Sequence, residues 1–84
     1  MKTYVDKESG LKWGIETTED EDGTIVHFYD MRYPMHGKPG QFVSSYYLET
    51  LNGIEPDMGI NLEGGVPGWG VSGELLQAVL RGIK

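Results

Sequence analysis

The chain has 84 residues, with 13 acidic against 7 basic side chains and a formal net charge of −6. That length predicts one domain over residues 1–84 and excludes barrels and two-domain enzymes, since a barrel alone needs roughly 200 residues. The absence of cysteine excludes disulfides, cysteine-ligated zinc and thiol nucleophiles, while 38% of apolar residues is enough to form a folded core.

The first third of the chain predicts strands. Thr3–Val5 is a candidate short first strand, and Leu11–Thr17 alternates apolar with polar residues, which is typical of a half-buried strand. The dipeptide Asp22-Gly23 ends a charged run and marks a hairpin turn. Thr24–Tyr33 is rich in β-branched and aromatic residues and apolar on both faces, so we expect it to be a central strand.

The middle of the chain predicts a helix over Gln41–Asn52, after a loop at Pro34–Gly40. Two series of apolar residues are spaced four apart and would share helix faces: Phe42 and Tyr46, and Val43, Tyr47 and Leu51. Asn52-Gly53 is expected to stop this helix, with the glycine in the left-handed conformation.

The last third predicts a strand at Met58–Leu62 and a final helix. Ser72 is the expected N-cap, and Glu74 lies in the first turn, where the helix dipole favours an anion. Val71 and Leu76 occupy the positions of a hydrophobic staple. The apolar stripe of this helix is formed by Leu75, Leu76, Val79, Leu80 and Ile83.

The predicted order is therefore (β)ββαβα. We expect a small α+β domain, in which a mostly antiparallel sheet of three or four strands is covered by two helices.

The distribution of charge along the chain favours some classes of partner over others. No Lys or Arg occurs from residue 39 to residue 80, where Glu49, Glu55, Asp57, Glu63 and Glu74 lie. We expect no direct nucleic-acid binding, because phosphate binding needs basic side chains. A basic or nucleic-acid-binding protein would be attracted instead. Charges interrupt the N-terminus and apolar runs are short, so we expect no signal peptide, no membrane binding and a cytoplasmic location.

A glycine-rich segment precedes the last helix. Gly68–Gly73 matches the pattern G-x-G-x-x-G, but the acidic residue expected about 20 positions further on is missing, so we predict no dinucleotide and no other cofactor. Trp69 could project from this segment as an anchor for a partner or fold back onto the core. The candidate interaction residues are Trp69, Tyr46, Tyr47, Pro67, Gly68 and Gly70, and we expect one of the two tyrosines to be partly exposed.

Catalytic and metal-binding patterns are weak. His27 and His36 are nine residues apart and have no third ligand at metal-site spacing, so we predict no metal. No G-x-S-x-G motif occurs, and we predict no catalytic residue. An enzyme would gain support only if His27, Asp30 and Arg32 converged in a cleft. Trp13, on the apolar face of its strand, is expected in the core.

Three segments resemble small uncharacterised proteins that we associate with bacterial mobile elements such as conjugative elements and prophages: Phe28–Tyr33, Gly40–Leu51 and Gly64–Trp69. The resemblance implies an accessory role and no catalytic residue.

The sequence thus predicts a non-enzymatic, acidic interaction module, a monomer or a homodimer, that binds a protein partner through the Gly/Trp loop and the Tyr-rich helix. The alternative is a small-ligand-binding or catalytic domain, with a pocket between the sheet and the helices or at a dimer interface.

Overall fold

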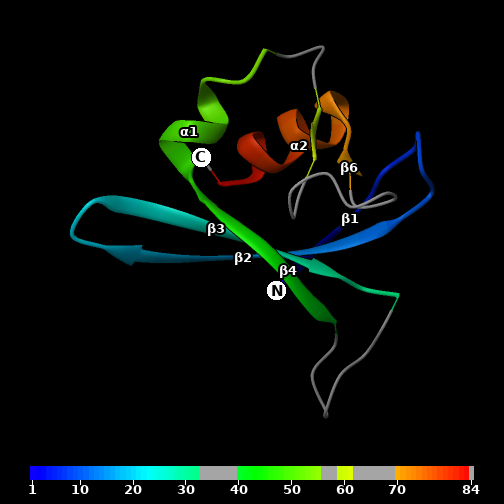
Figure 1. Ribbon diagram of the computed structural model, residues 1–84, viewed down its shortest axis with the longest axis horizontal. Coiled ribbons are helices and arrows are strands. Elements are labelled where there is room, and N and C mark those ends of the chain that lie inside the picture. The colour runs from blue at the N-terminus through cyan, green and yellow to red at the C-terminus, as the bar shows by residue number, and fades with distance from the viewer. Residues whose placement is uncertain (33–39, 56–58, 62–69, 84) are drawn as a thin grey trace.

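The computed structural model describes residues 1–32, 40–55, 59–61 and 70–83. Its main feature is a four-stranded antiparallel sheet in the order β1-β2-β3-β4. These strands are β1 (Lys2–Val5), β2 (Lys12–Asp20), β3 (Gly23–Asp30) and β4 (Gln41–Tyr47). The chain continues through α1 (Leu48–Asn52), the paired short strands β5 (Ile60–Asn61) and β6 (Gly70–Val71), and α2 (Gly73–Ile83). Both helices lie on the same side of the sheet (Figure 1), which confirms the predicted α+β class.

The β2–β3 hairpin forms as the sequence predicts. The two strands pair from Trp13 opposite Asp30 to Asp20 opposite Gly23. Gly23 has a φ of 134°, a conformation that other residues rarely adopt. One oxygen of Asp20 accepts hydrogen bonds from the backbone N–H groups of Asp22 and Gly23, at 2.8 and 3.1 Å. β3 lies between β2 and β4 and is therefore central, as expected.

The helix predicted over Gln41–Asn52 is wrong for its first seven residues, which form β4. The four-residue spacing that suggested a helix is incidental, because the segment is rich in Val, Tyr and Phe, which favour strands. Pairing with β3 decides the outcome, since β3 is apolar on both faces and gains a second neighbour. A bulge opposite Phe28 and Tyr29 inserts Val43 as an extra residue.

The end of α1 also differs from the prediction. The backbone of Gly53 is in the right-handed helical conformation, with φ −82° and ψ −5°. The N–H groups of Gly53 and Ile54 bond to the carbonyls of Thr50 and Leu51 at 3.2 Å, closing a tight last turn without the left-handed conformation. The strand predicted at Met58–Leu62 is formed in part, as β5. Met58 and Leu62, the ends of the predicted strand, lie outside the described residues.

The last helix is confirmed. Ser72 caps α2 by accepting the N–H of Leu75 on its hydroxyl at 3.2 Å. The backbone N–H of Ser72 in turn donates to the buried carboxylate of Asp6 at 2.9 Å. Asp6 also accepts the N–H of Glu8 at 3.0 Å, so one side chain joins the β1–β2 connection to the start of α2.

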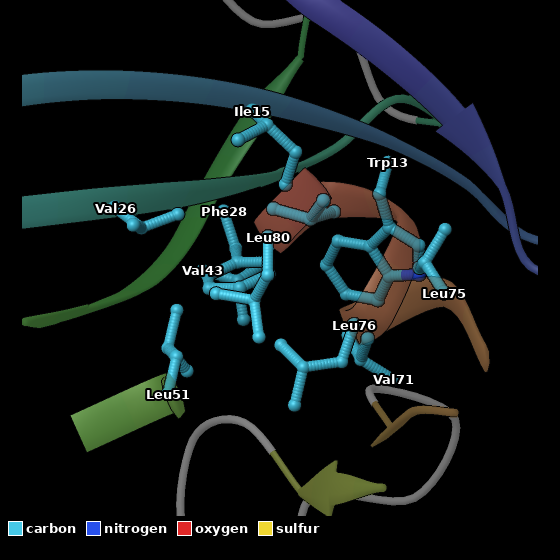
Figure 2. Close-up of a cluster of buried hydrophobic side chains, with 11 residues drawn as sticks. Trp13, Ile15, Val26, Phe28, Val43, Leu51, Val71, Leu75, Leu76 and Leu80 are labelled. Atoms are coloured by element: carbon cyan, nitrogen blue, oxygen red, sulfur yellow. The ribbon is translucent and has the colours of Figure 1, made fainter. Parts of the chain in front are cut away.

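The core lies between the sheet and α2 (Figure 2). Trp13, Val26 and Phe28 point from the sheet and are fully buried, with Trp13 and Phe28 in an edge-to-face contact at 6.5 Å. The core residues are Trp13, Ile15, Val26, Phe28, Val43, Leu51, Val71, Leu75, Leu76, Val79 and Leu80. The predicted stripe of α2 is thus buried, apart from the half-buried Ile83. None of the described helices has the length and apolar character needed to cross a bilayer.

Candidate functional site on the open face of the sheet

The face of the sheet that points away from α1 and α2 is here called the open face. Because side chains alternate along a strand, the residues opposite one another in the register share this face. It carries Thr3, Val5, Lys12, Gly14, Glu16, Thr18, Asp20, Ile25, His27, Tyr29, Phe42, Ser45 and Tyr47. Neither helix covers it (Figure 1), and 51% of Phe42 and 38% of Tyr47 are exposed to solvent.

A bulge explains why Phe42 and Tyr47 share the open face although they are five residues apart. Phe42 lies opposite Tyr29, whereas Ser44 lies opposite Phe28, so Val43 is the unpaired extra residue. Val43 is buried in the core. The bulge therefore turns both Val43 and Ser44 toward the core side, which leaves Phe42 on the same face as Ser45 and Tyr47.

Alternate residues of β2 hold the polar ends of the rings on this face. The hydroxyl of Thr18 and Nε2 of His27 are 2.7 Å apart in a hydrogen bond. The hydroxyl of Tyr47 donates to Oδ2 of Asp20 at 2.8 Å, and the side chain of Tyr29 is hydrogen-bonded to Glu16. Each bond restricts a ring before any partner arrives, which lowers the entropy cost of binding.

Aromatic contacts hold Phe42 although it is half exposed. Its ring lies 5.6 Å from that of Tyr29 at 68° and 6.3 Å from that of His27 at 53°. Such pairs contribute about 0.5–1.5 kcal/mol beyond the area they bury. Phe42 is thus an ordered apolar side chain in contact with water, beside the partly exposed rings of Tyr29 and His27.

The hydrogen bonds shift the acid–base properties of this face. The Tyr47 hydroxyl bond, with help from the backbone N–H groups of Asp22 and Gly23, holds the pKa of Asp20 below its ordinary value of 3.8. The same bond to Asp20 raises the pKa of Tyr47. Partial burial, and then Glu16, raise the pKa of Tyr29. At neutral pH this face therefore presents protonated tyrosines beside the Asp20 carboxylate.

The two predicted interaction tyrosines do not form one patch. Consecutive strand residues point to opposite faces, so Tyr47 lies on the open face while Tyr46 packs against Phe28 on the core side at 6.2 Å. Tyr47 is the partly exposed member of the pair, as expected. Of the other predicted site residues, Gly70 lies in β6 opposite Asn61 and is half-buried, whereas Pro67, Gly68 and Trp69 lie outside the described residues.

The enzyme arrangement considered from the sequence is not formed. His27 lies on the open face, but Asp30 is three residues further along β3 and is buried on the opposite face. The Asp30 carboxylate and the Arg32 guanidinium form an ion pair at 2.8 Å. In the described part of the chain, no group of three His, Asp or Glu side chains could hold a metal ion.

A hollow of about 590 Å³ opens between β1, β2 and the end of α2. Its lining includes Lys2, Tyr4, Glu16 and Gly82. The ammonium of Lys2 donates to the Gly82 carbonyl at 3.0 Å, and therefore caps the negative end of the helix.

Sequence reasoning missed Phe42, Tyr29 and His27 as members of one surface, because it placed Phe42 on a helix. The composition of residues 42–47, with Val and three aromatic rings among six residues, was the available signal for a strand. No protein-family model, curated protein or solved structure shows significant similarity to this chain. Function is therefore inferred from the chain's own geometry and charge.

Proposed function

We propose that the chain is a non-enzymatic interaction module that binds a basic protein partner through the open face. The observation that carries the proposal is Phe42, which is half exposed yet held by Tyr29 and His27 on a face that neither helix covers. Ordered aromatic residues of this kind are the usual anchors of protein interfaces.

Charge favours a basic partner. Glu16 and Asp20 lie on the open face, and the adjoining hairpin turn adds Glu21 and Asp22. Lys12 lies on the same face but at the far end of β2, and no Lys or Arg occurs between it and Arg32 in the sequence. A positively charged surface would therefore be attracted to this end of the sheet and would gain contacts with the rings beside the carboxylates.

The test begins with a tagged capture from lysate of the source organism, followed by identification and purification of the captured protein. Its affinity is then measured by titration against wild type, Phe42→Ala and Val5→Ala. Val5 is the matched control, because it is 60% exposed on the same face but on the opposite edge strand, beside Lys12 and far from the acidic hairpin turn. We expect Phe42→Ala to weaken binding at least about tenfold and Val5→Ala to have little effect.

Equal affinities for the two variants would contradict the proposal, provided that both melt as cooperatively as wild type. A partner whose affinity does not fall with added salt would contradict its basic character. Trp69 remains a sequence-based prediction, and Trp69→Ala is measured in the same series. If that variant binds normally, the glycine-rich segment is no part of the interface.

A further inference from the structure

The two edge strands of the sheet are protected very differently. β1 begins with Lys2, which is tied to the last turn of α2, and is followed by Asp6, which is tied to the start of α2. β4 contains no charged residue and no proline. Within the described part of the chain, β4 pairs with β3 alone.

An edge strand presents unpaired backbone N–H and C=O groups along its free side, and proteins usually guard such an edge with lysine, proline or a bulge. The bulge at Val43 hinders pairing with a further strand only at the start of β4. The remainder, Ser44–Tyr47, ends in two strand-favouring tyrosines and has no charge, and these are features of a strand that accepts another strand.

We propose that an extended, basic segment of the partner adds to β4 as a fifth strand, an inference that rests on the interaction function proposed above. Backbone hydrogen bonds to β4 would supply affinity. Alternate side chains of the added strand would then lie beside Phe42 and Tyr47, whose ring faces attract arginine and lysine.

Charge distinguishes this occupant from a second copy of the chain. Two copies that each carry a net charge of −6 repel one another when their edges meet. The end of β4 is also acidic: Asp20 is bonded to Tyr47, and Glu49 follows two residues later. A hollow of about 300 Å³ at this end is lined in part by Asp22, Tyr47 and Glu49, and has no basic residue in its lining. A basic strand meets no like charge among the described residues at this end.

The first probe is a short synthetic peptide in which arginine alternates with valine, in its parent form and in two N-methylated forms. One form is methylated on the odd residues and the other on the even residues. An added strand bonds along one edge only, so one methylated form should bind as the parent does. The other should bind at least about tenfold more weakly, because several hydrogen bonds are lost.

The second probe is a pair of variants at Ser45, an exposed residue of β4. Ser45→Lys places a guarding cation on the edge strand, whereas Ser45→Glu places a side chain of similar length with the opposite charge. We expect the lysine variant to bind the parent peptide at least about fivefold more weakly and the glutamate variant to bind it as wild type does or more tightly. Hydrogen exchange should slow at the β4 amides when the parent peptide binds.

Three outcomes would overturn strand addition. The two methylated peptides could lose affinity equally, or the parent peptide could fail to bind while the captured partner still depends on Phe42. Both outcomes exclude the added strand, and the open-face function survives wherever the captured partner still depends on Phe42. Sedimentation could instead reveal a dimer that Ser45→Lys dissociates, which would assign the edge to a second copy. If no partner depends on Phe42 either, the proposed function fails as well.

Discussion

The two faces of the β2–β3 hairpin are built from alternate residues of the same strands, yet they have opposite properties. On the inner face, Trp13, Val26 and Phe28 are fully buried in the core that the sheet shares with both helices. On the open face, Glu16, Thr18 and Asp20 hold aromatic rings that remain in contact with water. The inner face gains free energy of folding from buried apolar area, whereas the exposed polar contacts add little. Stability and recognition should therefore be separable by substitution.

The largest effect is expected from Leu76→Ala. Leu76 is fully buried among the core side chains, so truncation should lower the free energy of unfolding by about 2–5 kcal/mol. Phe42→Ala, on the open face, is the matched comparison and should cost less, because half of the ring is already exposed and its removal leaves no enclosed cavity. Urea unfolding of both variants measures the difference. Equal losses would show that the open face is part of the stabilising core.

The next largest effect is expected at Asp6, a buried carboxylate that joins the β1–β2 connection to the start of α2. Asp6→Ala leaves the N–H groups of Ser72 and Glu8 without their acceptor. We expect a loss of about 2–3 kcal/mol in the free energy of unfolding. Asp6→Asn keeps one acceptor oxygen and should recover part of that loss in the same urea titration. An unchanged midpoint for Asp6→Ala would mean that water replaces the carboxylate.

The sequence is sufficient to predict an element wherever its local chemistry and its pattern of burial agree. The alternation around Trp13 and Ile15 and the Asp22-Gly23 turn predicted the hairpin, and the Ser72 cap with the stripe through Leu76 predicted α2. The prediction for residues 41–47 is wrong, because a four-residue spacing of apolar residues fits a helix as well as a bulged strand. Pairing with β3, a contact between distant residues, decides between them, and a spacing rule does not include such contacts.

The same limit applies to the candidate site. The prediction that one of Tyr46 and Tyr47 is partly exposed needed only the local pattern, and it is confirmed for Tyr47. The grouping of Phe42 with Tyr29 and His27 depends on the β3–β4 register and on the bulge at Val43. Neither can be deduced from one segment alone, because the register is a property of two strands.

The hairpin turn tests how firmly the two faces are kept apart. If the pairing of β2 with β3 slipped by one residue, the side chains that are now buried would point to the open face, and those on the open face would point to the core. The turn at Gly23 therefore helps to decide which side chains lie on each face. Gly23→Ala forces a side chain into a φ of 134° and should cost about 1–2 kcal/mol in thermal unfolding. Gly53→Ala is the control: its φ is −82°, and we expect no loss of stability there. If the two variants melt alike, the turn conformation contributes nothing to the register.

The smallest effect, and the most specific to the open face, is expected from Tyr47→Phe. Removing the hydroxyl should raise the pKa of Asp20 toward 3.8, but not fully, since the backbone N–H groups of Asp22 and Gly23 still lower it. Tyr29→Phe, the same change on the same face, should leave the pKa of Asp20 where it is, because Tyr29 is bonded to Glu16. A titration of the Asp20 carboxyl carbon by NMR distinguishes the two variants.

The sign of the accompanying stability change follows from linkage. A carboxylate whose pKa is lower in the folded state contributes stability above its unfolded value of 3.8 and loses it as the pH falls through the folded value. The stability difference between wild type and Tyr47→Phe should therefore be fully present at neutral pH and shrink under acid. It should also shrink at high pH, once the raised pKa of Tyr47 is passed and the hydroxyl no longer donates. A difference that is constant across both ranges would mean that Tyr47 stabilises the face through its ring alone, and the Asp20 contact would then have no part in ordering the surface.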